Sequence, residues 1–378
     1  MPMNQALQQI VERIRAATTD ATPLCILGGG TKDFHGEAPQ GETLRTTGLT
    51  GITSYEPSEL VVTVRAGTPL AELEAVLAEK GQCLPFEPPH FGSSGATTVG
   101  GMVAAGLSGP ARASVGAVRD YVLGATLVNG RGEVLSFGGQ VMKNVAGYDV
   151  SRVLAGSLGT LGVITEVSLK VLPVAPAEAT LEFACGQADA LRLLNEWGGR
   201  PLPLNASCWF EHAGVGALYL RLRGAVAAVE AACAHLGGER KDNARAAADW
   251  QSLRDQQLPW FTAAEGPDAL WRLSVPQTAP VLALALDGTA AAPLIEWHGG
   301  QRWYKAPLGH AAHIREIARA AGGHATLFRL PAGAGADAHH GIPRFDALSA
   351  PVARIHRALM QEFDPHRLFN RGRLFAAE

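Results

Sequence analysis

The chain has 378 residues, of which 47% are hydrophobic and 18% are charged, and its formal net charge is −3. This composition excludes a disordered chain, and the length allows a sizeable core and favours two domains. Because the charge is nearly neutral and no basic cluster stands out, we expect neither nucleic-acid binding nor direct binding to an anionic membrane. The first residues lack the apolar core of a signal peptide and no run approaches a membrane span, so we expect a soluble cytoplasmic protein.

Cysteine and histidine usage gives no sign of a metal site. No two cysteines form a CxxC pair, which argues against a disulfide framework, a structural zinc and a self-contained iron–sulfur cluster. The cysteines are Cys25, Cys83, Cys185, Cys208 and Cys233. The adjacent His339 and His340 could bind a metal, but they lie in the Gly/Ala-rich stretch 331–341, which predicts a surface loop. We therefore expect no metal.

The first elements lead into a glycine-rich loop. Residues 4–17 predict an amphipathic helix, and Leu24 to Leu27 predict a short strand that runs into GGGTKD, residues 28–33. The following residues have no helical periodicity, so this is not the Rossmann dinucleotide-binding fingerprint. Consecutive backbone N–H groups in such a loop can still form an anion-binding nest.

Four further elements are expected before residue 173. Residues 60–65 predict a strand, and LAELEAVLAEK predicts a helix in which Thr68 is the N-cap and Pro69 the first helical residue. Tyr121–Val128 and Glu133–Phe137 predict a hairpin around Asn129-Gly130. The alternation from residue 163 to residue 171 predicts a half-exposed strand.

Glycine is concentrated in this first half. Of the 44 glycines, 25 lie between Gly28 and Gly162, and they are frequent in the run Gly95–Leu172. Glycine costs conformational entropy, so such a density needs a reason, and the available reasons are unusual dihedral angles or close approach of a ligand to the backbone. The run therefore predicts a large ligand against the main chain, with tight turns between strands as the alternative. The composition changes after Pro173, which predicts a domain boundary there.

From Thr180 onward the pattern alternates between strands and helices. Helical periodicity predicts helices over 187–197, 225–236, 245–256 and 311–321, and a last helix over Ala350–Phe363. Strand-like runs lie between them: LEFAC, NASCWFEH, ALYLRLR, ALWRLSV, LIEWHG and ATLFRL. This order predicts an α+β domain with an antiparallel sheet.

Several motifs in this order carry a family resemblance. They are GGGTKDFHG, LVVTVRAGTPLAELEAVLAEKG, GATTVGGMVAAGLSG, SVGAVRDYVLGATLV, KNVAGYD, GSLGTLGVITEVSLKVLP and DPHRLFNRGR. Together they resemble the PCMH-type FAD-binding domain of the vanillyl-alcohol-oxidase family. The motifs EPPH, VMKNVAGYD and AGGHAT are most similar to those of flavin subunits of bacterial glycolate oxidases.

The resemblance implies a fold of class α+β. A two-part PCMH-type FAD-binding domain would span residues 1–173, and an α+β cap domain with an antiparallel sheet would span 174–345. The C-terminal helix and tail, 346–378, would return to pack on the FAD domain.

The resemblance also implies FAD, held without a covalent bond, and a set of residues along it. His35 is the one histidine near the first loop that could form a covalent tether, and it falls a few residues past the glycines. The implied cofactor-binding residues are Gly28, Gly29, Gly30, Thr31, Lys32, Thr97, Thr98, Val99, Gly100, Gly101, Ser114, Gly116, Asp120, Gly156, Gly159, Thr160, Leu161, Gly162, Val163, Ile164 and Asn370. Arg371 stands where relatives carry proline in a terminal Asn-Pro-Gly motif.

No catalytic residue is implied. The catalytic relatives carry a His-Gly-Asp-Gly-Asn-type motif in the second domain, and this sequence has none. A 2-hydroxy-acid oxidation needs an arginine for the carboxylate and a histidine for the hydroxyl proton. The candidates are His324, Arg329 and the run Trp303-Tyr304-Lys305, and His90 is a candidate ligand contact; for both histidines a structural role is the simpler interpretation.

The function implied is an FAD-dependent oxidoreductase subunit of a multi-subunit glycolate oxidase, which converts glycolate to glyoxylate. It would support catalysis or relay electrons beside a homologous catalytic flavin subunit, with an iron–sulfur subunit as acceptor. Such a complex would lie in the cytoplasm or peripherally at the inner membrane. The alternatives are a non-catalytic assembly subunit with weak or no flavin, and a self-sufficient flavin oxidase of another small hydroxy acid or alcohol.

Overall fold

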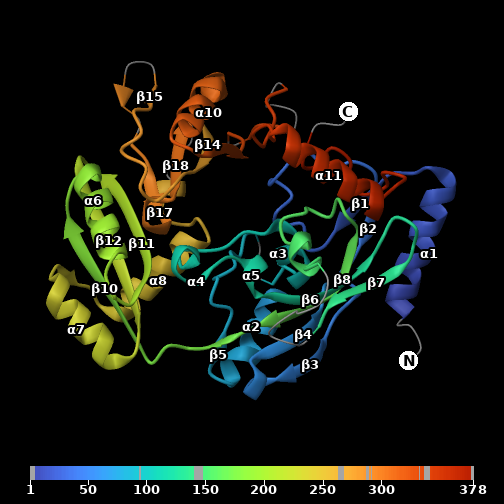
Figure 1. The fold of residues 1–378 in the computed structure, drawn as a ribbon, viewed down its shortest axis with the longest axis horizontal. Coiled ribbons are helices and arrows are strands. Elements are labelled where there is room, and N and C mark those ends of the chain that lie inside the picture. Colours follow the sequence, from blue (N-terminus) through green and yellow to red (C-terminus); the bar gives the residue numbers. More distant parts are fainter. Residues whose placement is uncertain are drawn as a thin grey trace. The chain divides into compact units, whose positions relative to one another are not determined.

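The computed structural model describes residues 5–92, 95–139, 148–262, 268–286, 289–290, 292–331, 333–335 and 341–375. Most of the KNVAGYD motif and the pair His339-His340 lie outside these residues. The chain divides into two compact units (Figure 1). Unit 1 comprises Met1–Leu107, Ala117–Pro173 and Ala347–Glu378, and unit 2 comprises Ser108–Gly116 and Val174–Asp346.

Unit 1 is built on a five-stranded antiparallel sheet in the order β3-β4-β8-β6-β7. Its strands are β3 (Ile52–Glu56), β4 (Val61–Arg65), β6 (Val122–Val128), β7 (Val134–Gly138) and β8 (Val163–Lys170). The predicted hairpin around Asn129-Gly130 is confirmed by the β6–β7 pairing. The strand predicted over residues 163–171 is present as β8, but the prediction that it is half-exposed was wrong. Strand β8 lies in the middle of the sheet, and Ser168 on its second face is buried and hydrogen-bonded to Thr63.

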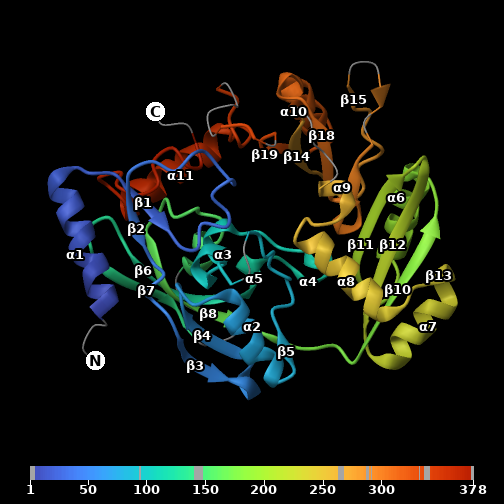
Figure 2. The ribbon, with the colours of Figure 1, turned by 180° about the vertical axis from the view of Figure 1, so that it is seen from behind.

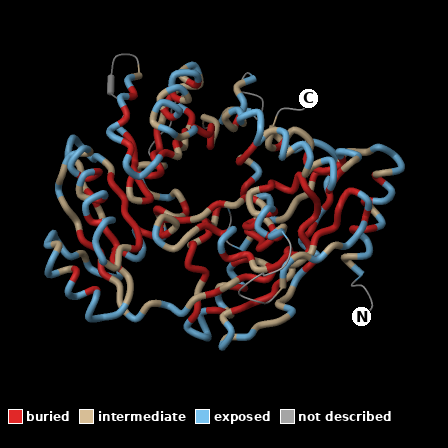
Figure 3. Tube along the Cα trace, viewed as in Figure 1, coloured by how far each residue is buried: buried red, intermediate tan, exposed pale blue. Residues whose placement is uncertain are grey.

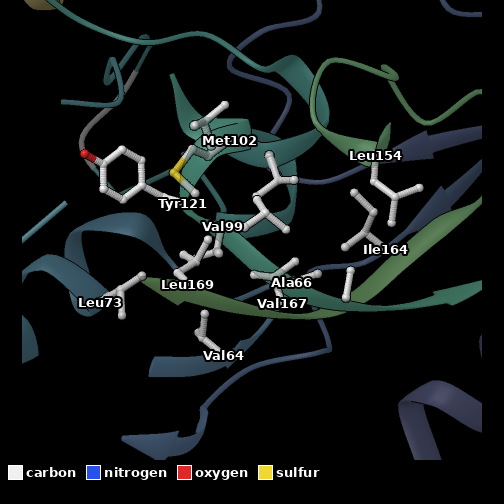
Figure 4. Close-up of a cluster of buried hydrophobic side chains, with 14 of the residues drawn as sticks. Val64, Ala66, Leu73, Val99, Met102, Tyr121, Leu154, Ile164, Val167 and Leu169 are labelled. Carbon is white, nitrogen blue, oxygen red and sulfur yellow. The ribbon is translucent and has the colours of Figure 1, made fainter. Parts of the chain in front are cut away.

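Two helices pack on this sheet and fill its core. Helix α2 (Leu70–Glu79) and helix α3 (Val99–Ala105) place Leu73, Val99 and Met102 against strand residues such as Val64 and Val167 (Figure 4). Helix α2 is confirmed, but its N-cap is Pro69, because the Thr68 hydroxyl instead accepts a hydrogen bond from the Gly51 N–H at 3.0 Å. Helix α3 was not predicted; Thr98 caps it by accepting from the Gly101 N–H.

The remainder of unit 1 brings both ends of the chain together. Helix α1 (Gln5–Asp20) packs by Ile10, Val11 and Ile14 near the parallel pair β1 (Leu24–Leu27) and β2 (Glu42–Arg45). Helix α11 (Ala350–Phe363) precedes a segment whose Phe369 bridges Leu24 of β1, and Figure 2 shows α11 on the same side as β1 and β2. Smaller elements are η1 (Pro57–Glu59), β5 (Gln82–Cys83), α5 (Val118–Tyr121), η2 (Ser151–Leu154) and β9 (Leu172–Pro173).

Unit 2 contains one eight-stranded sheet in the order β13-β10-β12-β11-β17-β18-β14-β19, and all its pairs are antiparallel, as the sequence predicted. The strands are β10 (Ala177–Ala184), β11 (Leu204–His212), β12 (Val215–Gly224), β13 (Glu239–Arg240), β14 (Ala269–Ser274), β17 (Leu294–Glu296), β18 (Gln301–Ala306) and β19 (His324–Arg329). A separate short pair is β15 (Ala285–Leu286) and β16 (Thr289–Ala290).

Helices pack on this sheet in two hydrophobic clusters, and the strand residues in those clusters are buried (Figure 3). The helices are α4 (Arg112–Val115), α6 (Gln187–Gly198), α7 (Val226–Leu236), α8 (Asn243–Arg254), α9 (Pro259–Thr262) and α10 (Ala311–Ala320), with η3 (Trp297–Gly299) and η4 (Leu308–His310). Helices α6 and α7 pack on β10, β11 and β12. On β14, Trp271 and Leu273 pack against Ile314 of α10, so Arg272 between them points to the opposite face.

Within the described residues, no helix has both the length and the apolar character needed to cross a membrane. All five cysteines are free thiols. In the described part of the chain, His, Cys, Asp and Glu side chains form no group of three that could hold a metal.

Candidate functional site

A pocket in unit 1 lies where β1 runs into the glycine-rich loop. It brings together segments that are far apart in sequence: the loop after β1, the start of α3, and the 370–373 segment. The pocket is lined by Cys25, Ile26, Gly28, Gly29, Gly30, Thr31, Lys32, Asp33, Pro39, Thr97, Thr98, Gly101, Ala104, Ala105, Leu158, Asn370 and Arg373. Nine of the predicted cofactor residues are in this set: Gly28, Gly29, Gly30, Thr31, Lys32, Thr97, Thr98, Gly101 and Asn370.

The loop presents unused backbone donors to this pocket. Among the described residues, the N–H groups of Gly28, Gly29, Gly30 and Thr31 donate no hydrogen bond to the protein. The Thr31 and Thr97 hydroxyl groups lie 3.1 Å apart at the same place. Successive free N–H groups form a concavity that attracts an anion, and no helix N-terminus is needed for this. The loop therefore has the chemistry of a phosphate site.

Two buried cations flank these donors. Lys32 is 8% exposed, with its ammonium over the Phe91 ring at 5.6 Å, and Arg373 is 5% exposed. Burial lowers the pKa of Arg373, and the nearby Asp33, Cys25 and Glu37 counteract this. Burial raises the pKa of Asp33, and Arg373 counteracts that rise. With one acid and two cations, the pocket has a formal charge of +1, which suits a diphosphate.

Glycine at positions 28 and 29 is required by the protein itself. A Cβ at Gly29 would lie 1.5 Å from the Ala96 carbonyl oxygen, and one at Gly28 would lie 2.5 Å from the Thr98 hydroxyl. Neither distance is sterically possible for a carbon atom, so the loop can pack on residues 96–98 only because both positions lack side chains. This close packing places the loop N–H groups beside the Thr97 and Thr98 hydroxyls.

Asn370 ties three parts of the pocket together. Its side-chain oxygen accepts from the Ile26 N–H at 2.7 Å, and its side-chain nitrogen donates to the Leu158 carbonyl at 2.6 Å. Its own N–H donates to the Leu24 carbonyl at 2.9 Å, and its backbone is left-handed, with φ of 42°. Asparagine tolerates this conformation better than most residues. The protein contacts therefore occupy the Asn370 amide.

Other predicted residues support the pocket without lining it. Val99 is fully buried in the core, and a Cβ at Gly100 would lie 2.6 Å from the Ala66 Cβ. Gly159 has φ of +75°, and a Cβ there would lie 2.7 Å from the Asn370 amide nitrogen. At the start of β8, Gly162 packs on Val128 and is followed by the buried pair Val163 and Ile164.

Three predicted residues lie at a second pocket of unit 1. Gly156, Thr160 and Leu161 line it together with the basic side chains Arg119 and Arg152 and further residues, namely Val153, Ala155, Ser157, His356, Leu359, Met360 and Leu374. The turn 156–161 thus contributes Leu158 to the first pocket and its neighbours to the second.

The structure places the last three predicted residues elsewhere. The Asp120 carboxylate accepts from the Ala117 N–H at 2.8 Å and caps helix α5. Ser114 and Gly116 belong to the 108–116 segment, which folds with unit 2. His35 is buried, and neither it nor His90 is among the residues that line the first pocket. His90 Nε2 lies 2.9 Å from the Glu74 carboxylate.

Ser114 forms part of a hydrogen-bonded array in unit 2. Its hydroxyl lies 2.9 Å from His298 Nε2, and the Ser207 hydroxyl lies 3.1 Å from His298 Nδ1. Trp297 and His298 both have φ of +54°, which is a strained backbone for residues with side chains. Burial lowers the pKa of His298 to about 4, so the imidazole is neutral at physiological pH.

The lowered pKa of His298 predicts that the folded protein loses stability in acid. Its folded pKa lies below its unfolded value, so the unfolded state binds more protons and stability falls as pH drops from about 6.5 to about 4. The loss reaches at most about 3 kcal/mol. Denaturant unfolding at pH 7 and pH 4.5 should show a smaller acid loss for His298→Gln than for the native chain, whereas His313→Gln, at an exposed site, should leave the loss unchanged. Equal losses in the native chain and His298→Gln would contradict the assignment.

A second candidate site, here called the Arg272 face, lies on the sheet face of unit 2 opposite α10. Arg272 pairs across the strands with Trp303 and Thr326, and its guanidinium lies 5.4 Å from the centre of the Phe328 ring. Trp303 packs edge-on against Phe328 at 4.9 Å and against Phe261 at 5.7 Å. The Arg272 face therefore combines a cation with a wall of aromatic rings.

Arg272 differs from Arg302, a buried arginine of the same sheet. Arg302 is fully buried and donates to the carbonyls of Gly299, Pro280 and Ala279. Arg272 is half-buried, and within the described part of the chain its guanidinium has no hydrogen bond or ion pair. Burial lowers its pKa to about 10, and the nearby cation Arg112 adds to this shift. A desolvated cation beside another cation is costly without an anionic partner.

The residues named as catalytic candidates lie around this face or point away from it. Lys305 pairs with Leu270 two residues along β18 from Trp303, and its ammonium lies 5.1 Å from the Trp260 ring centre. Tyr304 points into the opposite core, and burial raises its pKa to about 12. Burial lowers the pKa of Arg329 to about 10. His324 begins β19, and burial and Arg272 lower its pKa.

Arg272 and Arg373 were missed by sequence reasoning. A weak signal was available for both: Arg272 interrupts the apolar strand ALWRLS, and Arg373 follows Asn370 in the motif NRGR. Neither signal says which other segment the side chain meets.

The pocket of unit 1 fits a dinucleotide diphosphate. It has free backbone donors, hydroxyl groups, two cations and small residues at Gly101, Ala104 and Ala105 that leave room near the main chain. When bound, FAD supplies the redox chemistry, while the protein binds, orients and tunes it.

Comparison with known proteins agrees with this geometry. The family described as FAD binding domain matches residues 5–138. The chain is 45% identical to the glycolate oxidase subunit GlcE of Escherichia coli over 369 residues, covering 98% of this chain and 97% of that protein. It is 33% identical to a D-lactate dehydrogenase of Archaeoglobus fulgidus over 168 residues, covering 44% of this chain and 37% of that protein.

A second flavoprotein relative and the solved structures extend the picture. The glycolate oxidase subunit GlcD of Bacillus subtilis is 32% identical over 170 residues, which are 44% of this chain and 36% of that subunit. An alkyldihydroxyacetonephosphate synthase structure matches with a TM-score of 0.67 at 16% identity, covering 96% of this chain and 74% of that chain. At that identity the likeness shows the fold alone.

Proposed function

This chain belongs to the family of glycolate oxidase subunit GlcE, and from that membership we propose that it is the FAD-binding subunit of a glycolate-oxidising assembly. The expected fold class, the FAD cofactor and the character of an FAD-linked oxidoreductase subunit are confirmed by the family and domain matches. We further propose that FAD is held non-covalently, that a homologous flavin subunit carries the catalysis, and that an iron–sulfur subunit accepts the electrons.

The observation that carries the proposal is the pocket at the end of β1. Four successive N–H groups, from Gly28 to Thr31, have no partner among the described residues and meet two buried cations, Lys32 and Arg373, in one unit. An assembly subunit that had lost flavin would have no use for donors arranged in this way. The domain boundaries at 173 and 345, and the full set of cofactor residues, remain predictions.

The test is an absorbance spectrum of the purified chain, followed by addition of glycolate. We expect a flavin spectrum that does not bleach with glycolate until the partner subunits are added. A colourless chain that cannot be reconstituted with FAD would exclude the proposal. A mass spectrum of the denatured chain that retains flavin would exclude the non-covalent form.

A second candidate function is favoured by the Arg272 face. The half-buried Arg272 with its aromatic wall has the chemistry of a receptor for a small carboxylate, which an assembly subunit does not need. This chain would then oxidise a small 2-hydroxy acid itself. Turnover of glycolate by the isolated FAD-loaded chain with an artificial electron acceptor would favour this function over a division of labour between two subunits.

A further inference from the structure

The segment 364–374 forms part of the pocket wall. The Leu24 N–H donates to the Leu368 carbonyl at 2.7 Å, and the Asn370 N–H donates to the Leu24 carbonyl at 2.9 Å. The Asp364 carboxylate accepts from the N–H groups of Leu368 and Phe369, which fixes the start of this segment. The segment thus lies along β1, the strand that leads directly into the glycine-rich loop.

Arg373 joins this segment by hydrogen bonds to the residues that follow the glycine-rich loop. Its guanidinium donates to the carbonyls of Lys32 and Glu37, and its own carbonyl accepts from the Glu37 N–H at 3.0 Å. Two nitrogens of the planar guanidinium therefore donate to backbone carbonyls within residues 32–37. Residues 28–31, whose N–H groups have no partner among the described residues, come directly before the stretch 32–37 that Arg373 holds.

The charge on Arg373 is balanced locally without a direct ion pair. Asp33, Glu37 and Cys25 all favour its charged form, although within the described residues no carboxylate lies within 4.0 Å of its guanidinium. A buried arginine of this kind stabilises the carbonyls it contacts and leaves a positive field in the pocket. That field favours an anion on the loop.

We propose that Arg373 is a positioning residue for the cofactor, and that FAD binding and docking of the 364–374 segment stabilise each other. Arg373 fixes the backbone of residues 32–37, and through it the orientation of the loop donors. The inference rests on the proposed FAD pocket. Because coupling between two binding events is reciprocal, FAD must protect the segment by the same factor by which the docked segment strengthens FAD binding.

The test compares three variants by FAD affinity and by hydrogen exchange. Arg373→Met removes both the charge and the guanidinium donors, and Arg373→Lys keeps the charge but not the planar guanidinium. Arg371→Met is the control. Arg371 is two residues away, and among the described residues its side chain bonds only carbonyls of its own segment, at Arg367 and His366. The dissociation constant of FAD is measured on the full apo chain by flavin fluorescence, and amide exchange is followed in residues 366–374 with and without FAD.

We expect Arg373→Met to weaken FAD binding about 5-fold to 150-fold, the range of ordinary coupling energies. It should also abolish the FAD-dependent protection of residues 366–374 that the native chain shows. Arg373→Lys should fall between, since an ammonium cannot serve two carbonyls in one plane. Arg371→Met should match the native chain.

The outcomes separate this inference from the proposed function. If the native chain does not bind FAD, the proposed function fails and this inference fails with it. If the native chain binds FAD but exchange in residues 366–374 is unchanged by FAD, only the inference fails. An FAD affinity of Arg373→Met within twofold of the native value would also overturn it. If Arg373→Met does not fold, the Arg373→Lys variant and the native exchange data decide the same question.

Discussion

Alanine at Gly29 is expected to abolish FAD binding and to lower the free energy of unfolding by about 3 kcal/mol, the upper end of ordinary overpacking costs. The added Cβ would lie 1.5 Å from the Ala96 carbonyl oxygen, so either the loop or residues 96–98 must move. Any such movement separates the loop N–H groups from the Thr97 and Thr98 hydroxyls. The measurement is bound flavin per chain, with the unfolding midpoint in urea.

The matched control is Gly139→Ala. Gly139 is a unit 1 glycine whose Cβ would meet nothing within 4 Å and whose φ is not in the left-handed region. This variant should bind FAD normally and unfold within about 0.5 kcal/mol of the native chain, as for ordinary surface substitutions. If Gly29→Ala retained a full complement of FAD, the packing of the loop on residues 96–98 could not be what arranges the pocket.

Local signals account for the parts of the fold that the sequence predicts well. The Asn129-Gly130 hairpin and the last helix, Ala350–Phe363, follow from turn chemistry and periodicity within a few residues, and the structure has both. The misplaced features depend on distant partners. Strand β8 alternates in sequence, but β4 and β6 on either side and packing on both faces bury it. Similarly, the Thr68 hydroxyl accepts from the distant Gly51 N–H, and the N-cap of α2 is Pro69.

The candidate pocket shows the same limit. Its loop could be found because glycines and a lysine follow a strand, and this pattern is local. Arg373 could not be found, because its importance comes from contact with the carbonyls of Lys32 and Glu37 more than 300 residues earlier, and no periodicity encodes that pairing. Likewise, the glycines at 100 and 162 are predicted as cofactor residues, and nothing in the sequence indicates that a Cβ there would meet Ala66 and Val128.

The Arg272 face raises the question of whether this subunit recognises substrate. The nearby Arg112 adds to the lowering of the Arg272 pKa, Arg272 in turn lowers the pKa of His324, and no acid among the described residues shifts the pKa of Arg272. An uncompensated cation is expected to reduce the stability of the unliganded protein and to increase the gain on binding an anion. These two effects have opposite signs, so one substitution can measure both.

Leucine at Arg272 is expected to weaken binding of a small carboxylate by about 10-fold to 100-fold, the loss expected for charge-assisted hydrogen bonds. The same variant is expected to raise the stability of the unliganded chain by about 1 kcal/mol, because it removes a half-buried charge that has no partner among the described residues. Oxalate is a suitable probe, since it presents carboxylates but has no hydroxyl group to oxidise. Its affinity is measured by titration calorimetry on the FAD-loaded chain, and stability by denaturant unfolding without ligand.

Arg223→Leu is the matched control, because Arg223 also lies on a strand of this sheet but already pairs with Glu178. It should leave oxalate binding unchanged and should not raise stability. If Arg272→Leu bound oxalate as the native chain does, the Arg272 face would not be a carboxylate receptor. If binding were lost together with stability, Arg272 would be a structural cation, because removal of an uncompensated charge cannot destabilise the unliganded fold through electrostatics.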